Sequence, residues 1–118
     1  MNIQLTINGQ VLAATLEDSA AACDFAALLP LTLDLEDYAA TEKIAQLPRK
    51  LSTTGAPTGI TPAIGDITYY APWGNLAIFY NDFGHATGLV KLGHIEGDIQ
   101  VLRGQGPLKA RIEAVGKN

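Results

Sequence analysis

The segment GDITYYAPWGNLAIFYND, from Gly65 to Asp82, holds two apolar runs separated by a Pro-Trp-Gly corner. Residues 66–70 and 75–80 are rich in aromatic and apolar side chains, which favours two strands. Side chains alternate between the two sides of a strand, and here both sides are substantially apolar. Part of the aromatic set must therefore fill a core, while the other part faces outward beneath a helix, a loop or a partner. In the first run Ile67 and Tyr69 oppose Thr68 and Tyr70, and in the second Leu76, Ile78 and Tyr80 oppose Asn75, Ala77 and Phe79.

The outward side of this segment is a candidate ligand groove, because aromatic side chains beside a long loop are typical of concave binding sites. Trp73 lies between Pro72 and Gly74, so it is expected at a corner, where its ring can reach over the mouth of a groove. The alternative, in which the aromatic side chains form only a core, stays open. The candidate ligand-binding residues in this segment are Tyr70, Trp73, Phe79 and Tyr80.

An N-terminal hairpin is predicted from the alternation of IQLTI, the following Asn8-Gly9 pair and the continuation QVLAATL. Asn-Gly between alternating runs is a strong hairpin signal, because the tight turn needs positive φ at both central residues. We expect antiparallel strands near residues 2–7 and 10–16.

A helix over about residues 19–29 follows, in the Ala-rich sequence SAAACDFAALL. Asp18 or Ser19 can cap its N-terminus, and Pro30 stops it. Cys23, the only cysteine, is expected to be a small buried residue of this helix, since one thiol forms no internal disulfide.

The rest of the chain reads as short strands separated by turn signals. The strand candidates are LTLDLEDY (31–38), EKIAQL (42–47, ended by Pro48), the two aromatic runs, GLVKLGHI (88–95), DIQVL (98–102) and KARIEAV (109–115). Residues 49–62, rich in Thr, Gly and Pro, are expected to form a long loop. Many short strands with one helix indicate a β-barrel or a sandwich rather than a βαβ fold.

Composition limits the classes of function. The sequence has 118 residues, 47% hydrophobic and 17% charged, which favours a single folded domain over residues 1–118. The net charge is −4 and the eight Lys and Arg residues are scattered, so neither nucleic acid nor a membrane surface is an expected partner. The start MNIQLTINGQ lacks a signal-peptide pattern and no long apolar stretch occurs, so a soluble cytoplasmic protein is expected.

Three strings, FAALLPLTLDLEDY, GDITYYAPWGNLAIFY and GLVKLGHIEGDIQVL, resemble the bacterial and archaeal cyclophilin-like domain proteins. With the N-terminal hairpin, the resemblance covers nearly the whole chain. It implies a mainly β fold, a closed eight-stranded barrel in which the helix near residues 19–29 caps one end. Pattern alone does not separate such a barrel from a sandwich.

Cyclophilins isomerise X-Pro bonds with an arginine on a barrel strand, and the strand in that order here, residues 31–38, has none. Leu89 stands near the place of a cyclophilin histidine, and IAQ loosely resembles a Met-x-Gln pocket element, which would retain Gln46. We therefore expect a noncatalytic binding module, for a small molecule or an extended peptide, between the aromatic strands and the 49–62 loop. The alternatives are a divergent prolyl isomerase that uses Arg49 or Gln46, and an interaction domain with the aromatic face as its oligomer interface. No cofactor is implied.

His85 and His94, the only histidines, lack further ligands at useful spacing, so no metal site is expected. The acidic residues Asp34, Glu36, Asp37 and Glu42 could do acid–base work or hold a cation. A solvated strand face is the favoured interpretation of this cluster.

Overall fold

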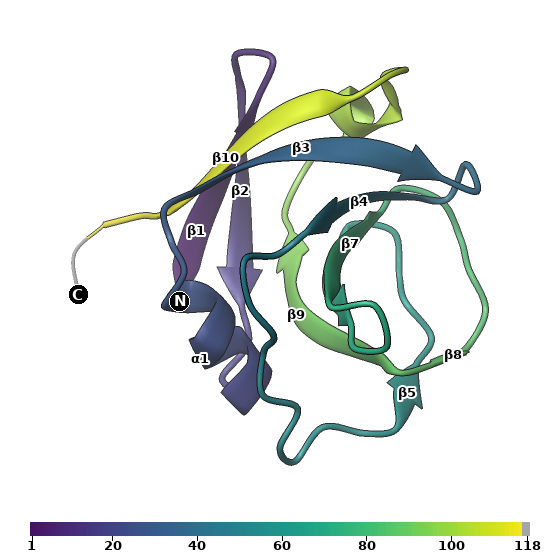
Figure 1. Ribbon diagram of the computed structural model, residues 1–118. Helices are drawn as coiled ribbons and strands as arrows, with labels where there is room; N and C mark the ends of the chain where they lie inside the picture. The colour runs from purple at the N-terminus through teal and green to yellow at the C-terminus, as the bar shows by residue number, and fades with distance from the viewer. Residues whose placement is uncertain (117–118) are drawn as a thin grey trace.

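Eight antiparallel strands close into a barrel in the computed structural model, which describes residues 1–116 (Figure 1). Around the barrel the strands follow the order β1-β10-β3-β4-β7-β6-β9-β2, and β2 pairs with β1 to close it. The predicted mainly β barrel with one short helix is confirmed. The barrel strands are β1 (Asn2–Ile7), β2 (Gln10–Leu16), β3 (Leu31–Tyr38), β4 (Glu42–Gln46), β6 (Asp66–Tyr70), β7 (Asn75–Phe79), β9 (Leu89–Ile95) and β10 (Leu108–Ala114).

The N-terminal hairpin forms as predicted. β1 and β2 pair antiparallel with Ile7 opposite Gln10, which leaves Asn8 and Gly9 as the two turn residues. Both have positive φ, 51° for Asn8 and 79° for Gly9. The Asn-Gly pair therefore sets the register in which β1 delivers Ile3, Leu5 and Ile7 to the core.

The helix α1 (Ala20–Ala26) lies at one end of the barrel (Figure 1). The Ser19 hydroxyl caps it by accepting a hydrogen bond from the Ala22 amide at 3.1 Å. It is shorter than predicted because the amides of Leu28 and Leu29 bond to carbonyls three residues back, which tightens the last turn. Cys23 is exposed, contrary to expectation. The buried positions Ala21, Ala22 and Phe25 define the inner face, and at 3.6 residues per turn Cys23 lies on the other side.

The two sides of the aromatic segment separate as the alternation requires. One side, Ile67, Tyr69, Leu76, Ile78 and Tyr80, joins the main core inside the barrel. The other side contributes to a second, outer cluster, in which Ala77, Phe79 and Leu89 are buried and Tyr70, Ile44, Ile60 and Ala86 pack against them. The barrel wall formed by β4, β7, β6 and β9 is therefore apolar on both sides.

A small two-stranded sheet, β5 (Gly59–Ile60) with β8 (Ala86–Thr87), lies outside the barrel. It was not predicted, because each strand has only two residues and β5 lies within the expected 49–62 loop. The pairing needs a close backbone approach: a Cβ on Gly59 would lie 2.4 Å from the Ala86 carbonyl oxygen. β5 and β8 hold the segment after residue 80 against the outer cluster.

The prediction of a strand at residues 98–102 is wrong. Residues Gln100–Arg103 form a 3₁₀ helix, η1. The Asp98 carboxylate accepts a hydrogen bond from the Gln100 amide at 2.9 Å, and such local bonding favours a turn over a strand. Leu102, which the strand pattern placed in a sheet, packs instead into the main core.

No helix within residues 1–116 has the length and apolar character needed to cross a membrane.

The turn at Gly9 gives a first prediction. Gly9→Val should destabilise the fold by at least about 1 kcal/mol, because a β-branched residue resists positive φ. A Cβ at Gly9 would meet no atom within 4 Å, so the loss would come from the backbone alone. Urea denaturation measures the loss, and Gly9→Asn, which tolerates this backbone, should be closer to the parent protein. Equal stabilities for the two variants would contradict the positive φ at Gly9.

Candidate functional site

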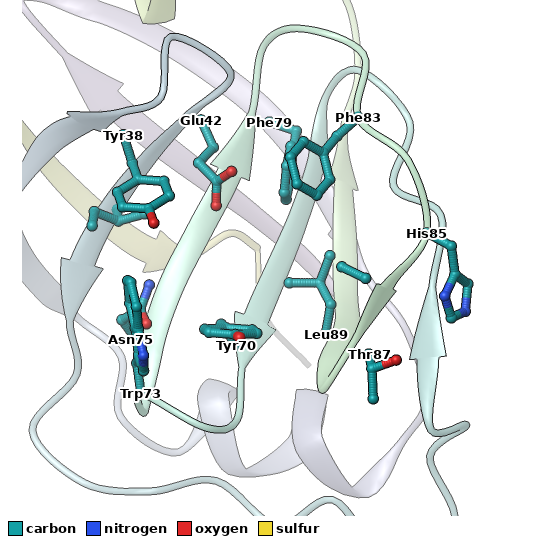
Figure 2. Close-up of a pocket in the computed structure, with 12 residues that line it drawn as sticks. Tyr38, Glu42, Tyr70, Trp73, Asn75, Phe79, Phe83, His85, Thr87 and Leu89 are labelled. Atoms are coloured by element: carbon teal, nitrogen blue, oxygen red, sulfur yellow. The ribbon is translucent and has the colours of Figure 1, made fainter.

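A pocket of about 300 Å³ lies on the outer side of the barrel wall formed by β4, β7, β6 and β9 (Figure 2). Alternation directs Ile44 of β4 and Asn75 and Phe79 of β7 to this side, since Lys43, Leu76 and Ile78 point inward. Residues 83–87 form the opposite wall and bring Phe83, whose ring centroid lies 5.7 Å from that of Phe79. The pocket is therefore a hollow between the barrel and its outer segment.

Three aromatic rings form one corner of the pocket. The Trp73 side chain is 53% exposed. Its ring centroid lies 5.6 Å from that of Tyr38, with an angle of 86° between the planes, and 5.4 Å from that of Tyr70, with an angle of 79°. These edge-to-face contacts are the favoured geometry of aromatic pairs. They hold the indole at the pocket rim.

The turn that carries Trp73 is fixed by its backbone. Gly74 has φ of 70°, and its amide donates to the Tyr70 carbonyl oxygen at 2.9 Å. Gln46 at the end of β4 donates from Nε2 to the carbonyl oxygens of Trp73 and Gly74, both at 3.3 Å. Gln46 thus clamps the turn, and its amide nitrogen is directed at the backbone rather than into the pocket.

Asn75 lines the pocket and keeps a buried acceptor unpaired. Its side chain is only 4% exposed, and Nδ2 donates to the Leu76 carbonyl oxygen at 3.1 Å. Within residues 1–116, Oδ1 of Asn75 has no hydrogen-bond partner. A buried acceptor left unpaired costs about 1–3 kcal/mol. A ligand that donates to this oxygen would recover that free energy.

Glu42 places a carboxylate in the same pocket. It begins β4 directly opposite Phe79 of β7, and only 9% of the residue is exposed. The Thr41 hydroxyl donates to its Oε1 at 3.1 Å. No Lys, Arg or His among residues 1–116 forms an ion pair with it. Burial raises the pKa of the Glu42 carboxyl, and the charge of Asp37 raises it further.

Tyr80, a candidate ligand residue, lies inside the barrel instead. Its hydroxyl donates to the Asp37 carboxylate, and Lys43 Nζ lies 5.6 Å from its ring centroid. The hydrogen bond from Tyr80 lowers the pKa of Asp37, and burial raises the pKa of Tyr80 to about 12. Lys43 is fully buried, donates to the Gly104 carbonyl oxygen at 2.8 Å and lies 3.4 Å from Asp37. Tyr80 and Lys43 are buried whereas the Asp37 side chain is 41% exposed, and none of the three lines the pocket.

Some of the remaining candidate ligand-binding residues line the pocket and one does not. Tyr70, Trp73 and Phe79 come together in the pocket, whereas Arg49 is exposed and does not line it. The 49–62 loop was expected to line the groove, and this expectation is wrong. The loop lines a different hollow beside α1, with Thr54 and Pro57. The reason is that the loop is tied to the helix side, where the Ser52 amide donates to Asp24 at 2.7 Å.

Among the lining residues that sequence reasoning did not assign to the pocket are Tyr38, Glu42, Asn75 and Phe83. Asn75 had a usable signal, since it shares the outward side of its strand with Phe79. Glu42 was grouped with a solvated acidic face, because its position opposite Phe79 depends on the pairing of β4 with β7. No cluster of three or more metal-binding side chains occurs within residues 1–116.

Similarity to known proteins agrees with this architecture. A family model described as the cyclophilin-like family matches residues 5–113. The chain belongs to the cyclophilin-like family. The barrel of this cyclophilin-like protein also resembles the solution structure of a hypothetical protein from Archaeoglobus fulgidus, with a TM-score of 0.67 and 15% sequence identity. That match covers 98% of this chain and 95% of the other, and at this identity it shows the fold alone. No curated protein matches the chain.

The buried carboxyl of Glu42 gives a prediction about stability and pH. Its pKa is raised above the ordinary 4.5, so the folded state holds this proton more tightly than the unfolded chain does. Its contribution to stability is therefore fully present below pH 4.5 and is lost as the pH rises through the raised folded-state pKa. Glu42→Gln keeps the shape and removes the charge, so it should be more stable than the parent protein at pH 7.

Urea denaturation at pH 7 and at pH 4 measures this effect. The advantage of Glu42→Gln should shrink at the lower pH, and Glu36→Gln, on the exposed part of β3, should show no such change. The quantity compared is the stability of Glu42→Gln minus that of the parent protein. If this difference is smaller at pH 7 than at pH 4, the burial of the Glu42 carboxylate is contradicted.

Proposed function

We propose that this cyclophilin-like protein is a noncatalytic binding module, which takes a small organic molecule or a short part of an extended peptide in the outer aromatic pocket. The observation that carries the proposal is the combination of exposed rings with the unpaired Oδ1 of Asn75. Ligand sites are typically apolar hollows with a few well-placed polar groups, and about 300 Å³ is at the small end of their range.

The shape of the aromatic surface favours a ligand over a second copy of the chain. Tyr38, Trp73 and Phe83 are 44%, 53% and 42% exposed, so three large aromatic residues remain accessible around the pocket. These rings surround a hollow, however, and its wall carries polar groups below the rim. A flat aromatic patch would suit an oligomer interface better, since such interfaces need close packing over a broad area.

Prolyl isomerisation is not supported by the arrangement of the pocket. Catalysis of this kind needs a donor aimed at the proline amide. Arg49 lies outside the pocket, and Gln46 donates to the turn backbone. We therefore expect no catalysed isomerisation of a proline peptide above the uncatalysed rate, in a protease-free assay by NMR exchange spectroscopy. A catalysed rate that Arg49→Ala abolishes would show that the loop supplies the donor.

Ligand binding is tested with N-methylbenzamide, a neutral probe that has an apolar ring and one N–H donor for Asn75. In an NMR titration, its binding should shift the amide signals of residues 70–79. Trp73→Ala should weaken this binding at least tenfold. It should lower the free energy of unfolding by less than the roughly 3–5 kcal/mol that truncation of a core tryptophan costs.

Tyr80→Phe is the matched control, because it alters an aromatic residue on the inner side of the same wall. It should lower stability by about 1 kcal/mol, through loss of the Asp37 hydrogen bond, and leave binding unchanged. A Trp73→Ala protein that loses stability like a core variant, with unaltered binding, would refute the assignment of this pocket.

A further inference from the structure

The pocket combines three features that single out one class of ligand. It has aromatic rings set at right angles to one another, a carboxylate with no cationic partner among residues 1–116, and a buried acceptor without a donor. We propose that the pocket binds a small organic cation, with a methylated ammonium group held between Trp73, Tyr70 and Glu42. This inference rests on the proposed function, because it specifies the ligand of the same pocket.

The aromatic corner of the pocket offers ring faces to a cation. The planes of Tyr70 and Trp73 are 79° apart at a centroid distance of 5.4 Å, and Tyr38 makes a second edge-to-face contact with the indole at 86°. In Figure 2 the ring of Tyr70 lies across the bottom of the pocket, and the indole of Trp73 stands upright beside it. The negative faces of perpendicular rings attract a cation from two directions, and methylated ammonium groups suit them because they are weakly hydrated.

The carboxylate of Glu42 offers a negative charge in the same pocket. Figure 2 shows it pointing into the pocket from the side opposite Tyr70. A cation above the Tyr70 ring therefore lies between an aromatic face and a negative charge. The lysine next to it in sequence is not available as a partner, because Lys43 points into the barrel and bonds to Gly104 and Asp37. The ligand would supply the positive charge that the chain itself does not.

The chemistry of the pocket argues against other cations. A metal ion needs several oxygen or nitrogen ligands, and no suitable cluster of three occurs among residues 1–116. A guanidinium group carries five N–H donors in a fixed plane, so it needs several acceptors around it in addition to a carboxylate. An ammonium group needs only one charge and apolar faces around it. A hydroxyl or amide N–H elsewhere on the same ligand would then donate to Oδ1 of Asn75.

The test compares choline with 3,3-dimethylbutan-1-ol, which has the same shape but carries carbon in place of the charged nitrogen. NMR titrations of the full chain at pH 7.5 should show at least tenfold tighter binding of choline, with shifts at residues 38–44 and 70–75. Glu42→Gln should reduce choline binding to the level of the neutral alcohol. Trp73→Leu, which keeps apolar bulk but removes the aromatic face, should also abolish the preference.

Glu36→Gln is the control, because it removes the same charge from an exposed position on β3 and should change choline binding by less than about twofold. N-methylbenzamide separates this inference from the proposed function. Binding of that neutral probe together with equal affinities for choline and the alcohol would overturn the cation inference and leave the binding function standing. A choline preference that survives Glu42→Gln would overturn the assignment to Glu42, and failure of all three probes would overturn both proposals.

Discussion

The structure depends on the closure of the barrel, because a closed sheet has one interior and each strand can present only every second side chain to it. Residues 66–80 contain more apolar side chains than one side of two strands can hold. Tyr69, Leu76 and Ile78 fill the interior, so Tyr70 and Phe79 must lie outside. The outer apolar side then needs its own cover, which the short β5–β8 sheet supplies only in part.

The uncovered part of that outer side is the candidate site. Two polar groups of this site lower the stability of the fold. Asn75 keeps an acceptor unpaired, and Glu42 keeps a carboxylate without a counter-ion among residues 1–116. Elsewhere in the same wall the buried charge of Lys43 is fully used, by Gly104 and Asp37. This contrast between the two sides of β4 supports a role in binding for the outer side, since functional sites commonly keep features that do not favour stability.

Local patterns were sufficient for most of the fold. Asn8-Gly9 determines a hairpin through its backbone, Ser19 determines the start of a helix through one hydrogen bond, and alternation separates Tyr69 from Tyr70. The prediction failed where a competing local bond decided the structure, as Asp98 does for residues 98–102. Tyr80 and the 49–62 loop were misplaced for another reason: which side of a strand is the interior, and which way a loop is tied, depend on partners distant in sequence.

One side of the β6–β7 hairpin stabilises the barrel, and we propose that the other side binds a ligand. Intermolecular nuclear Overhauser effects between bound N-methylbenzamide and the aromatic protons of the protein test it most directly. We expect contacts from the probe to the rings of Tyr70, Trp73 and Phe79, with none to Tyr69 or Tyr80. Contacts confined to the hollow between α1 and residues 54–57, or to the interior tyrosines, would contradict it.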